Sequence, residues 1–484
     1  MRDQLLQGIV DLDRESRLPL SEQIYRQVCI AVRDGVLPAG RRLPSSRKLA
    51  SSLGVSRNTV NTAYELLKSE TVVDIRTGAA PVIANRQPLD GMTNSLSAGE
   101  TVIKTLSARG NSLCVNPREK LRPVDGGILE PGVPAFDLFP RETWARSLRR
   151  VSRLMSQDDV FYRHVAGLPG LRELLARYLA EERGVKAVPE QVLVTSSTQA
   201  SLALLAQCFA DPGETAFIEE PGYLGARGAF ANADLNVLPL PVDNEGAIPP
   251  TGNQGPTPQL IYLTPSHQYP LGFAMPLARR LAFIELARTS GAFILEDDYD
   301  SEFLFSGRPV ASLQGLAAGP EVIYLGTFAK TMLPGIRVAY MVVPANLSEQ
   351  LSQAIRNMGM MASAPSQAAL ADFMAAGHYR SHLRKIRLAY QERGLALCNA
   401  LRARLGNRMD VFLPAGGIQL VARFKNNEDD QHIARLLQQR GVGVSALSAT
   451  YLQRPETGLI IGFSGADAPT IRRGVDEISA VLSQ

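Results

Sequence analysis

The chain has 484 residues, of which 45% are hydrophobic and 20% charged, and its net charge of +4 is too small to indicate a partner. This length predicts two or three globular domains. No apolar run approaches the roughly 20 residues of a membrane-spanning helix, and the polar N-terminus is unlike a signal peptide. The four cysteines lie far apart, which argues against disulfide and zinc sites and favours a protein of the reducing cytoplasm.

The first section, residues 1–84, has the pattern of a helix-turn-helix. One helix is expected in PLSEQIYRQVCIAVRDG, and two shorter amphipathic helices are expected at Ser46–Leu53 and Arg57–Leu67, joined by the turn GVS. Ser56 is the expected N-cap of the last helix. Two helices joined by so short a turn with a glycine are typical of DNA-binding proteins.

Positive charge gathers in the same section. From Arg41 to Lys68 the chain has six basic residues against one acidic residue, Glu65. Such a run can be a merely solvated surface, but here it coincides with the start of the second short helix, where helix-turn-helix proteins contact bases and phosphates. We therefore predict double-stranded DNA as a partner, with contacts from residues at or near the helix starts: Arg47, Lys48, Arg57, Asn58 and Thr59.

Residues 85–125 are rich in Ser, Asn, Gly and Pro and lack periodicity, so we expect a linker between two domains. From residue 126 to residue 484, short apolar runs alternate with helical patterns such as GLRELLARYLAEERG. The runs VLVTSS, TAFIEE, QLIYLTP, AFILEDD and VIYLGTF predict strands of a mostly parallel sheet that is buried on both faces. We expect an α/β domain whose large part ends near residue 345, with a smaller C-terminal part after it.

Polar side chains follow several of these expected strands, at the sheet edge where α/β proteins bind ligands. Lys330, which follows VIYLGTF, can condense with a carbonyl group, and Arg337 can bind a phosphate through two hydrogen bonds. A helix start with free N–H groups and nearby hydroxyls adds an anion site, for which the residues are Ser197, Thr198, Gln199 and Thr327.

Other side chains at this edge suit an aromatic ring. Asp297 can hold a protonated ring nitrogen, Tyr299 can donate to a phenolate oxygen, and Tyr223 offers a ring for stacking, while His267 lies in a loop of the same site. An amine, a carboxylate and a phosphate clamp are the groups that pyridoxal phosphate (PLP) needs, so PLP is the predicted cofactor. Each motif alone has a simpler interpretation: Lys330 as a surface lysine, and EDD as metal ligands or a solvated strand end. We predict no metal site.

Taken together, the motifs resemble a known family. GTFAKTMLPGIRVAY, LEDDYDSEF, TPSHQYPLG and EEPGYLGAR are similar to fold-type I aminotransferases, and the first section is similar to GntR-type winged helices. The combination resembles the MocR (GabR-like) subfamily of GntR transcriptional regulators. It implies a multidomain chain: an α+β winged helix-turn-helix followed by an α/β fold-type I PLP-dependent aminotransferase-like domain.

The resemblance also implies roles and partners. Lys330 would form a Schiff base with PLP, Asp297 would bind its ring nitrogen, Tyr299 its phenolate oxygen and Arg337 its phosphate. Tyr223 would stack on the ring and Ser197–Gln199 would line the phosphate site. A homodimer would bind two DNA half-sites in a promoter, and its effector would be PLP or an amino compound.

The chain departs from the family pattern in several places. Ser197 stands where the family usually has Gly, Ala329 where it has Ser, and Leu271 where it has Thr or Ser. The wing, usually GxGT, is TGAAPV with Gly78 alone retained, which leaves open whether the wing contacts DNA.

A further departure concerns the effector. Ile460 and Ile461 occupy the place where many relatives carry an arginine for a substrate carboxylate, and Arg227 or Arg423 could substitute. We predict a PLP-dependent transcriptional regulator, with weak or partial transamination at most, and keep two alternatives as the second and third functions. The second is a working aminotransferase with an accessory DNA-binding domain, and the third is a DNA-binding protein whose second domain no longer binds a cofactor.

Overall fold

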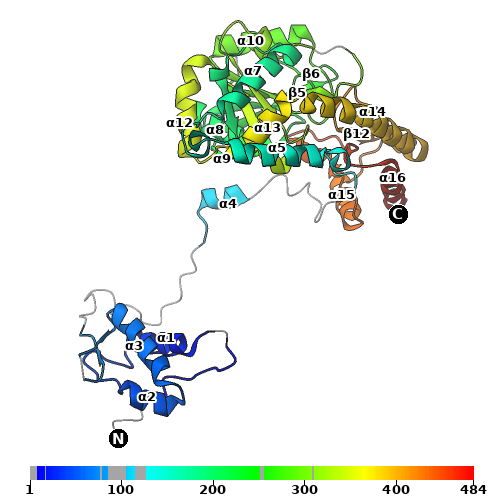
Figure 1. Cartoon of the computed structure of the whole chain (residues 1–484). Helices are drawn as coiled ribbons and strands as arrows, with labels where there is room; N and C mark the ends of the chain where they lie inside the picture. The colour runs from blue at the N-terminus through cyan, green and yellow to red at the C-terminus, as the bar shows by residue number, and fades with distance from the viewer. Residues whose placement is uncertain are drawn as a thin grey trace. The chain divides into compact units, whose positions relative to one another are not determined.

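The computed structural model describes residues 8–16, 18–76, 79–85, 105–114, 127–250, 255–307 and 310–483. The chain divides into two compact units, Met1–Thr105 and Leu106–Gln484 (Figure 1). None of the helices in the described ranges combines the length and the apolar character that crossing a lipid bilayer requires.

Three helices and a two-stranded antiparallel ribbon build the first unit. They are α1 (Leu20–Arg33), α2 (Ser46–Leu53), α3 (Arg57–Ser69), β1 (Val73–Asp74) and β2 (Val82–Ile83). The hydroxyls of Ser45 and Ser56 accept hydrogen bonds from the first turns of α2 and α3, and Gly54 follows α2 with a φ of 61°. The predicted helix-turn-helix is confirmed, and its second helix continues to Ser69.

The apolar faces of these elements close on one another. The buried core consists of Val10, Ile24, Val28, Ala31, Leu37, Leu43, Leu49, Ala50, Val60, Ala63, Tyr64, Leu67, Val73 and Ile83. Every member lies between Val10 and Ile83, so this unit has a hydrophobic core of its own.

Two sequence-based expectations fall mostly outside the described residues. Thr77 and Gly78, in the predicted wing, are not among them. Of the predicted linker at 85–125, the structure describes Asn85 and residues 105–114, which include helix α4 (Ala108–Cys114). The division into 1–84, 85–125 and 126–484 therefore stays a prediction.

An eight-stranded sheet forms the centre of the second unit. Its strands are β3 (Val192–Thr195), β4 (Thr215–Glu220), β5 (Asn236–Asp243), β6 (Gly246–Ala247), β7 (Pro258–Leu263), β8 (Phe293–Asp298), β9 (Val322–Thr327) and β10 (Ala339–Val342). Their order is β3-β10-β9-β8-β7-β4-β5-β6. Only β10 and β6 run against their neighbours, so the predicted mostly parallel sheet is confirmed.

Helices cover both faces of this sheet, which is why most of its strands are largely apolar and buried. The helices before the C-terminal part are α5 (Arg141–Leu154), α6 (Gln157–Val160), α7 (Pro169–Arg183), α8 (Thr198–Phe209), α9 (Leu224–Asn232), α10 (Leu277–Ser290), α11 (Leu313–Leu316), α12 (Ser348–Asn357) and α13 (Ala364–Ala375). Side chains of α8, α9 and α12 share one core with the sheet, and those of α7, α10 and α13 pack against its other face.

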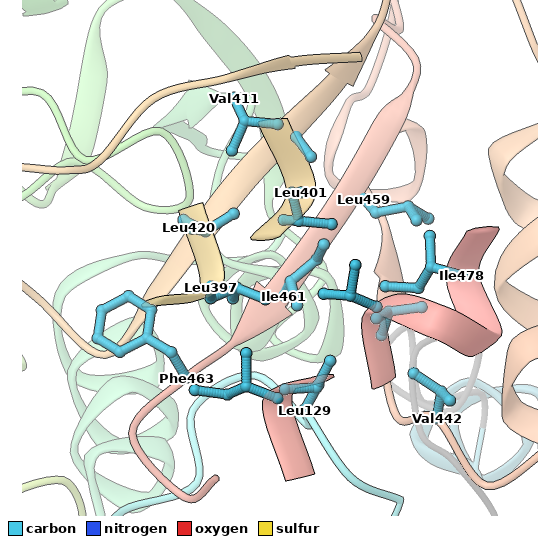
Figure 2. Close-up of a cluster of buried hydrophobic side chains, with 14 of the residues drawn as sticks. Leu129, Leu397, Leu401, Val411, Leu420, Val442, Leu459, Ile461, Phe463 and Ile478 are labelled. Atoms are coloured by element: carbon cyan, nitrogen blue, oxygen red, sulfur yellow. The ribbon is translucent and has the colours of Figure 1, made fainter. Parts of the chain in front are cut away.

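A smaller antiparallel sheet, ordered β11-β12-β14-β13, organises the C-terminal part. Its elements are α14 (His378–Leu405), β11 (Met409–Val411), β12 (Gln419–Phe424), α15 (Asp430–Gln439), β13 (Ser445–Ala446), β14 (Gly458–Gly462) and α16 (Ala468–Leu482). Figure 2 shows its core, in which Ile461 lies among Leu397, Leu401 and Leu420. Helices α12 and α13 pack on the large sheet, whereas this core takes in α14 and also Leu129, Ala135 and Phe303 from earlier in the chain.

Candidate functional site

The sheet register brings the predicted amine and the predicted phosphate ligands to one edge. Ala339, the first residue of β10, pairs with Thr195 of β3 on one side and with Thr327 of β9 on the other. Lys330 follows Thr327 by three residues and Arg337 precedes Ala339 by two. The sequence segments that carry these side chains therefore meet at the same end of the sheet.

The amine of Lys330 is held by a distant part of the chain. Its Nζ donates a hydrogen bond to the carbonyl oxygen of Gly132 at 2.7 Å. Gly132 has a φ of 78°, and a Cβ at this position would lie 2.8 Å from the Lys330 Nζ. The positive φ favours glycine here, and a side chain would also displace the Lys330 amine. Sequence reasoning did not find Gly132.

Asp297, the next-to-last residue of β8, is a buried carboxyl with one oxygen that lacks a hydrogen bond. The hydroxyl of Tyr262 donates to its Oδ2 at 2.7 Å, whereas its Oδ1 has no hydrogen-bond partner among the described residues. Burial raises the pKa of Asp297 to about 7, and the neighbouring Asp298 and Asp300 add to the rise. A buried acceptor oxygen without a donor is costly, and a protonated ring nitrogen would satisfy it. The site therefore fits the predicted cofactor at this point.

Tyr299, His267 and Asp300 form a cluster beside Asp297. His267 Nδ1 lies 3.0 Å from Asp300 Oδ2 and 3.1 Å from the Tyr299 hydroxyl. Burial opposes the charged imidazole, but the Asp300 carboxylate outweighs it, so the pKa of His267 is raised. The hydrogen bonds of His267 therefore join Tyr299 and Asp300.

Two glycines enclose His267. A Cβ on Gly272 would lie 2.9 Å from its Nε2, and a Cβ on Gly417 would lie 2.3 Å from its Cε1. Gly417 belongs to the C-terminal part, where its N–H donates to the carbonyl of Phe303 at 3.0 Å. The loop that contains Gly417 therefore packs directly on the cluster of Tyr299, His267 and Asp300. No sequence pattern predicted this contact.

The predicted phosphate ligands have different surroundings. Ser197 is the N-cap of α8, where its hydroxyl accepts from the Ala200 N–H at 3.1 Å, and Thr198 opens the helix, whose first N–H groups have no intrahelical acceptor. Gln199 instead donates its side-chain amide to the Gly225 carbonyl at 3.0 Å. Thr327 accepts from the Ala329 N–H at 3.1 Å.

Arg337 has an exposed side chain on a left-handed residue, with a φ of 56° and a ψ of 48°. Non-glycine residues rarely adopt this conformation, and those that do are often found at ligand sites. It ends the short turn at Pro334–Ile336 immediately before β10. The strained backbone is consistent with a residue whose guanidinium group must point in a particular direction.

Tyr223 joins the same site through another tyrosine. Its ring lies 6.3 Å from the Tyr262 ring at an interplanar angle of 25°, and 5.5 Å from the Tyr269 ring at 77°. Since the Tyr262 hydroxyl binds Asp297, Tyr262 connects the predicted stacking residue to the predicted nitrogen ligand. The sequence analysis did not identify Tyr262, because it lies inside the apolar run QLIYL. A single hydroxyl group in a strand that is otherwise buried and apolar could have indicated a role in the site.

The candidate carboxylate-binding residues and the two isoleucines have the following surroundings. Ile460 and Ile461 are both fully buried in β14. Arg423 pairs with Glu456 at 3.0 Å, and Arg227 donates to the carbonyl of Tyr451 at 3.3 Å. Both arginines therefore have partners within the C-terminal part.

In the first unit, the predicted DNA contacts differ in exposure. Arg47, Lys48, Arg57 and Asn58 are exposed at or near the starts of α2 and α3. Thr59 is half-buried, and its N–H and hydroxyl both contact Ser56 as part of the helix cap. Four of the five predicted side chains are thus accessible to a ligand.

Comparison with known proteins agrees with both halves of the chain. Residues 20–83 match the family of bacterial regulatory proteins of the gntR family, and residues 129–478 match aminotransferase class I and II. The chain belongs to the MocR-type GntR regulators. It is 39% identical to the probable rhizopine catabolism regulatory protein MocR of Rhizobium meliloti, over 97% of this chain and 95% of that protein.

Other proteins similar to this MocR-type chain include a regulator and an aminotransferase. The pyridoxine biosynthesis regulator PdxR of Corynebacterium glutamicum is 29% identical over 96% of this chain and 95% of its own length. The α-aminoadipate aminotransferase LysN of Thermus thermophilus, solved with N-(5'-phosphopyridoxyl)-L-leucine, superposes with a TM-score of 0.70. It is 26% identical and covers 78% of this chain and 97% of its own. The MocR-type chain is a DNA-binding transcriptional regulator with an aminotransferase-like domain, and that fold implies dependence on PLP.

Proposed function

We propose that this regulator holds PLP covalently on Lys330 and uses the loaded domain as its sensor. In this proposal Asp297 accepts a hydrogen bond from the protonated ring nitrogen, Tyr299 donates to the phenolate oxygen and Tyr223 stacks on the ring. The phosphate is bound by Arg337, Thr327 and the helix start at Ser197–Gln199. The observation that carries the proposal is the buried, unpartnered Oδ1 of Asp297 at the same sheet edge as Lys330.

The protein groups of this site do three things. Asp297 keeps the ring nitrogen protonated, and bound PLP then serves as an electron sink. His267 and Asp300 orient the Tyr299 hydroxyl, to which His267 is hydrogen-bonded. The Gly132 carbonyl holds the Lys330 amine in place, and a lysine amine placed in this way can attack a carbonyl carbon.

Borohydride reduction of the purified protein, followed by peptide mass mapping, tests the covalent link. The pyridoxyl mass is expected on the peptide that contains Lys330 and is expected to be absent in Lys330→Ala. Lys186→Ala, at an exposed position, is the matched control and should keep the label. A label on another lysine, or none in the wild type, would refute the assignment.

For the effector, we propose that ordinary α-amino acids bind weakly and are converted slowly or not at all. A buried carboxylate needs a cation, and the position where relatives carry an arginine is taken by fully buried isoleucines, Ile460 and Ile461. The signal is then PLP occupancy itself or an amine whose acidic group is bound elsewhere. Among the relatives, PdxR is named for the regulation of pyridoxine biosynthesis and MocR for that of rhizopine catabolism.

The second candidate function is a working aminotransferase, which the similarity to LysN favours. A panel of α-amino acids, added while the cofactor absorbance is followed, separates the two. Fast conversion of several common amino acids to the pyridoxamine form would contradict the sensor proposal. Unchanged absorbance with all of them, together with a response of DNA binding to free PLP, would support it.

We further propose a homodimer that binds two promoter half-sites in the cytoplasm, where the chromosome is. Exposed apolar side chains lie at the end of α5, at the end of α6 and just after α6. They include Leu154, Val160, Phe161 and Tyr162, whose exposed fractions run from 54% to 72%. Contiguous exposed apolar side chains of this kind mark interaction surfaces. A second copy of the chain is the proposed occupant.

A further inference from the structure

Helix α5 presents an arginine face that the proposed function does not use. Arg146, Arg149, Arg150 and Arg153 line one surface hollow on this helix, with Leu154 at its end. The spacing of three, four and seven residues from Arg146 places all four guanidinium groups on the same side of the helix. The only acidic residue of α5 is Glu142, in its first turn.

The opposite face of α5 fixes its orientation. Ser147 and Val151 are buried, and the Trp144 ring packs edge-on against Phe373 of α13 with centroids 5.9 Å apart. Because the apolar side of the helix is held against α13, the arginines must point to solvent. The arrangement is therefore rigid at the backbone and accessible at the guanidinium groups.

Little negative charge compensates this face. Arg150 lies 3.3 Å from Asp372, and no other ion pair joins a carboxylate to the four arginines within the described ranges. Like charges on adjacent turns of a helix repel one another. A polyanionic ligand would remove this repulsion, and guanidinium groups bind phosphate oxygens in bidentate fashion.

We infer that the arginine face of α5 binds the phosphate backbone of DNA next to the sequence bound by the helix-turn-helix. From Arg146 to Arg153 the helix rises about 10 Å, which matches roughly three phosphates of one strand at about 3.4 Å of helix axis per phosphate. The inference rests on the DNA binding of the first unit. That unit is joined to the second by roughly 40 residues, which can span at most on the order of 140 Å.

Tethering favours this second contact. Once the first unit is bound, the arginine face meets the flanking DNA at an effective concentration set by the connecting chain, so weak contacts suffice. Phosphate contacts carry no sequence information. The arginine face would therefore raise affinity without changing which promoter is preferred.

The test is the salt dependence of binding by the full-length protein to a promoter fragment that extends beyond the half-sites. The variant carries Arg146→Gln, Arg149→Gln and Arg153→Gln. Its slope of log K against log salt is expected to be shallower by about 2–3, and its affinity at low salt about tenfold lower. Discrimination between promoter and unrelated DNA should stay unchanged. In hydroxyl-radical footprints, protection of the flanking phosphates should disappear while that of the half-sites remains.

Two variants control for charge and for folding. Arg384→Gln, Lys385→Gln and Arg387→Gln remove three exposed cations from α14 and should leave the slope unchanged. Arginine-to-lysine changes at the three α5 positions keep the charge and should keep most of the slope.

An unchanged slope in the α5 glutamine variant, or an equal loss in the α14 variant, would overturn the inference. So would a lower mass by light scattering with an unchanged slope, because it would identify a protein interface. Absence of specific promoter binding by the wild type would instead count against the function of the first unit.

Discussion

At the scale of single residues, burial controls the protonation of the carboxyl groups around the candidate site. It raises the pKa of Glu219 to about 8, and those of Glu296, Asp297 and Glu302 to about 7. Glu219 lies in β4, Glu296 and Asp297 lie in β8, and Glu302 lies in the short turn that follows β8. Their charges therefore change near neutral pH.

Glu219 gives a pH-dependent prediction. Its Oε2 accepts from the N–H of Thr264 at 3.2 Å and also from the Thr264 hydroxyl, and only 2% of the residue is exposed. The folded chain keeps the proton up to about pH 8, whereas the unfolded chain releases it near 4.5. Folding stability due to this group is therefore lost as the pH rises between these values, by about 2 kcal/mol from pH 6 to pH 8.

Glu219→Gln removes that titration while keeping the neutral shape. The free energy of unfolding of the variant, from urea titrations at pH 6, 7 and 8, should fall less with pH than that of the wild type. Glu349→Gln, at an exposed carboxyl, is the control and should follow the wild type. Parallel curves for wild type and Glu219→Gln would show that Glu219 is ionised in the folded protein at pH 6.

At the scale of elements, the sequence predicted the pieces that have strong local patterns. The helices α2 and α3 were found because Ser56 and the glycine of GVS mark their ends, and the strands because their apolar runs stop at polar residues. Lys330 and Arg337 were identified because they lie in the segment between two of these strands, β9 and β10.

Long-range contacts account for the features that the sequence did not predict. Gly132 touches Lys330 across 198 positions of the chain, and Gly417 closes on His267 from the C-terminal part. Neither glycine lies in a motif. The sequence does not distinguish a glycine that allows a close contact from a glycine that forms a turn. The second contact of His267, with Asp300, depends on backbone geometry that periodicity does not specify.

Gly417→Ala tests the packing of the C-terminal loop on the site. A Cβ there would lie 2.3 Å from His267, and the φ of 89° already disfavours alanine. A loss of roughly 1–3 kcal/mol or more is expected from strain, together with weaker PLP retention as His267 and Tyr299 shift. Thermal unfolding and PLP titration measure the two effects.

Gly441→Ala is the matched control, because Gly441 has a φ of 78° but no atom within 4 Å of its Cβ position. It should lose stability from backbone strain alone and keep its affinity for PLP. Equal loss of PLP affinity in both variants would mean that the contact with His267 has no special role.

The start of α3 provides a prediction for DNA recognition. Arg57 is exposed there, and replacing a base-contacting arginine costs about 1–3 kcal/mol and relaxes specificity at one position. Arg57→Ala should therefore weaken promoter binding by this amount in a gel-shift series. Lys68→Ala, in the last turn of the same helix, serves as the control and should bind nearly as the wild type does. Unchanged affinity in Arg57→Ala would remove Arg57 from the interface.

At the scale of the whole molecule, the exposed apolar side chains near α6 predict self-association. Light scattering of the wild type at micromolar concentration should give about twice the chain mass of 52.4 kDa. Phe161→Glu should shift the mass toward one chain, because it would place a charge in a desolvated interface. Phe412→Glu, at a similarly exposed phenylalanine elsewhere, should remain a dimer. A wild type that is monomeric with PLP bound would contradict the proposal.

The closed core between Val10 and Ile83 has a consequence for how such regulators diversify. None of its members comes from the second unit, so a recombination event in the gene segment that encodes residues 85–104 would leave both cores intact. A single recombination event of this kind could join an existing aminotransferase-like domain to a different DNA-binding domain. Neither hydrophobic core would then need new residues.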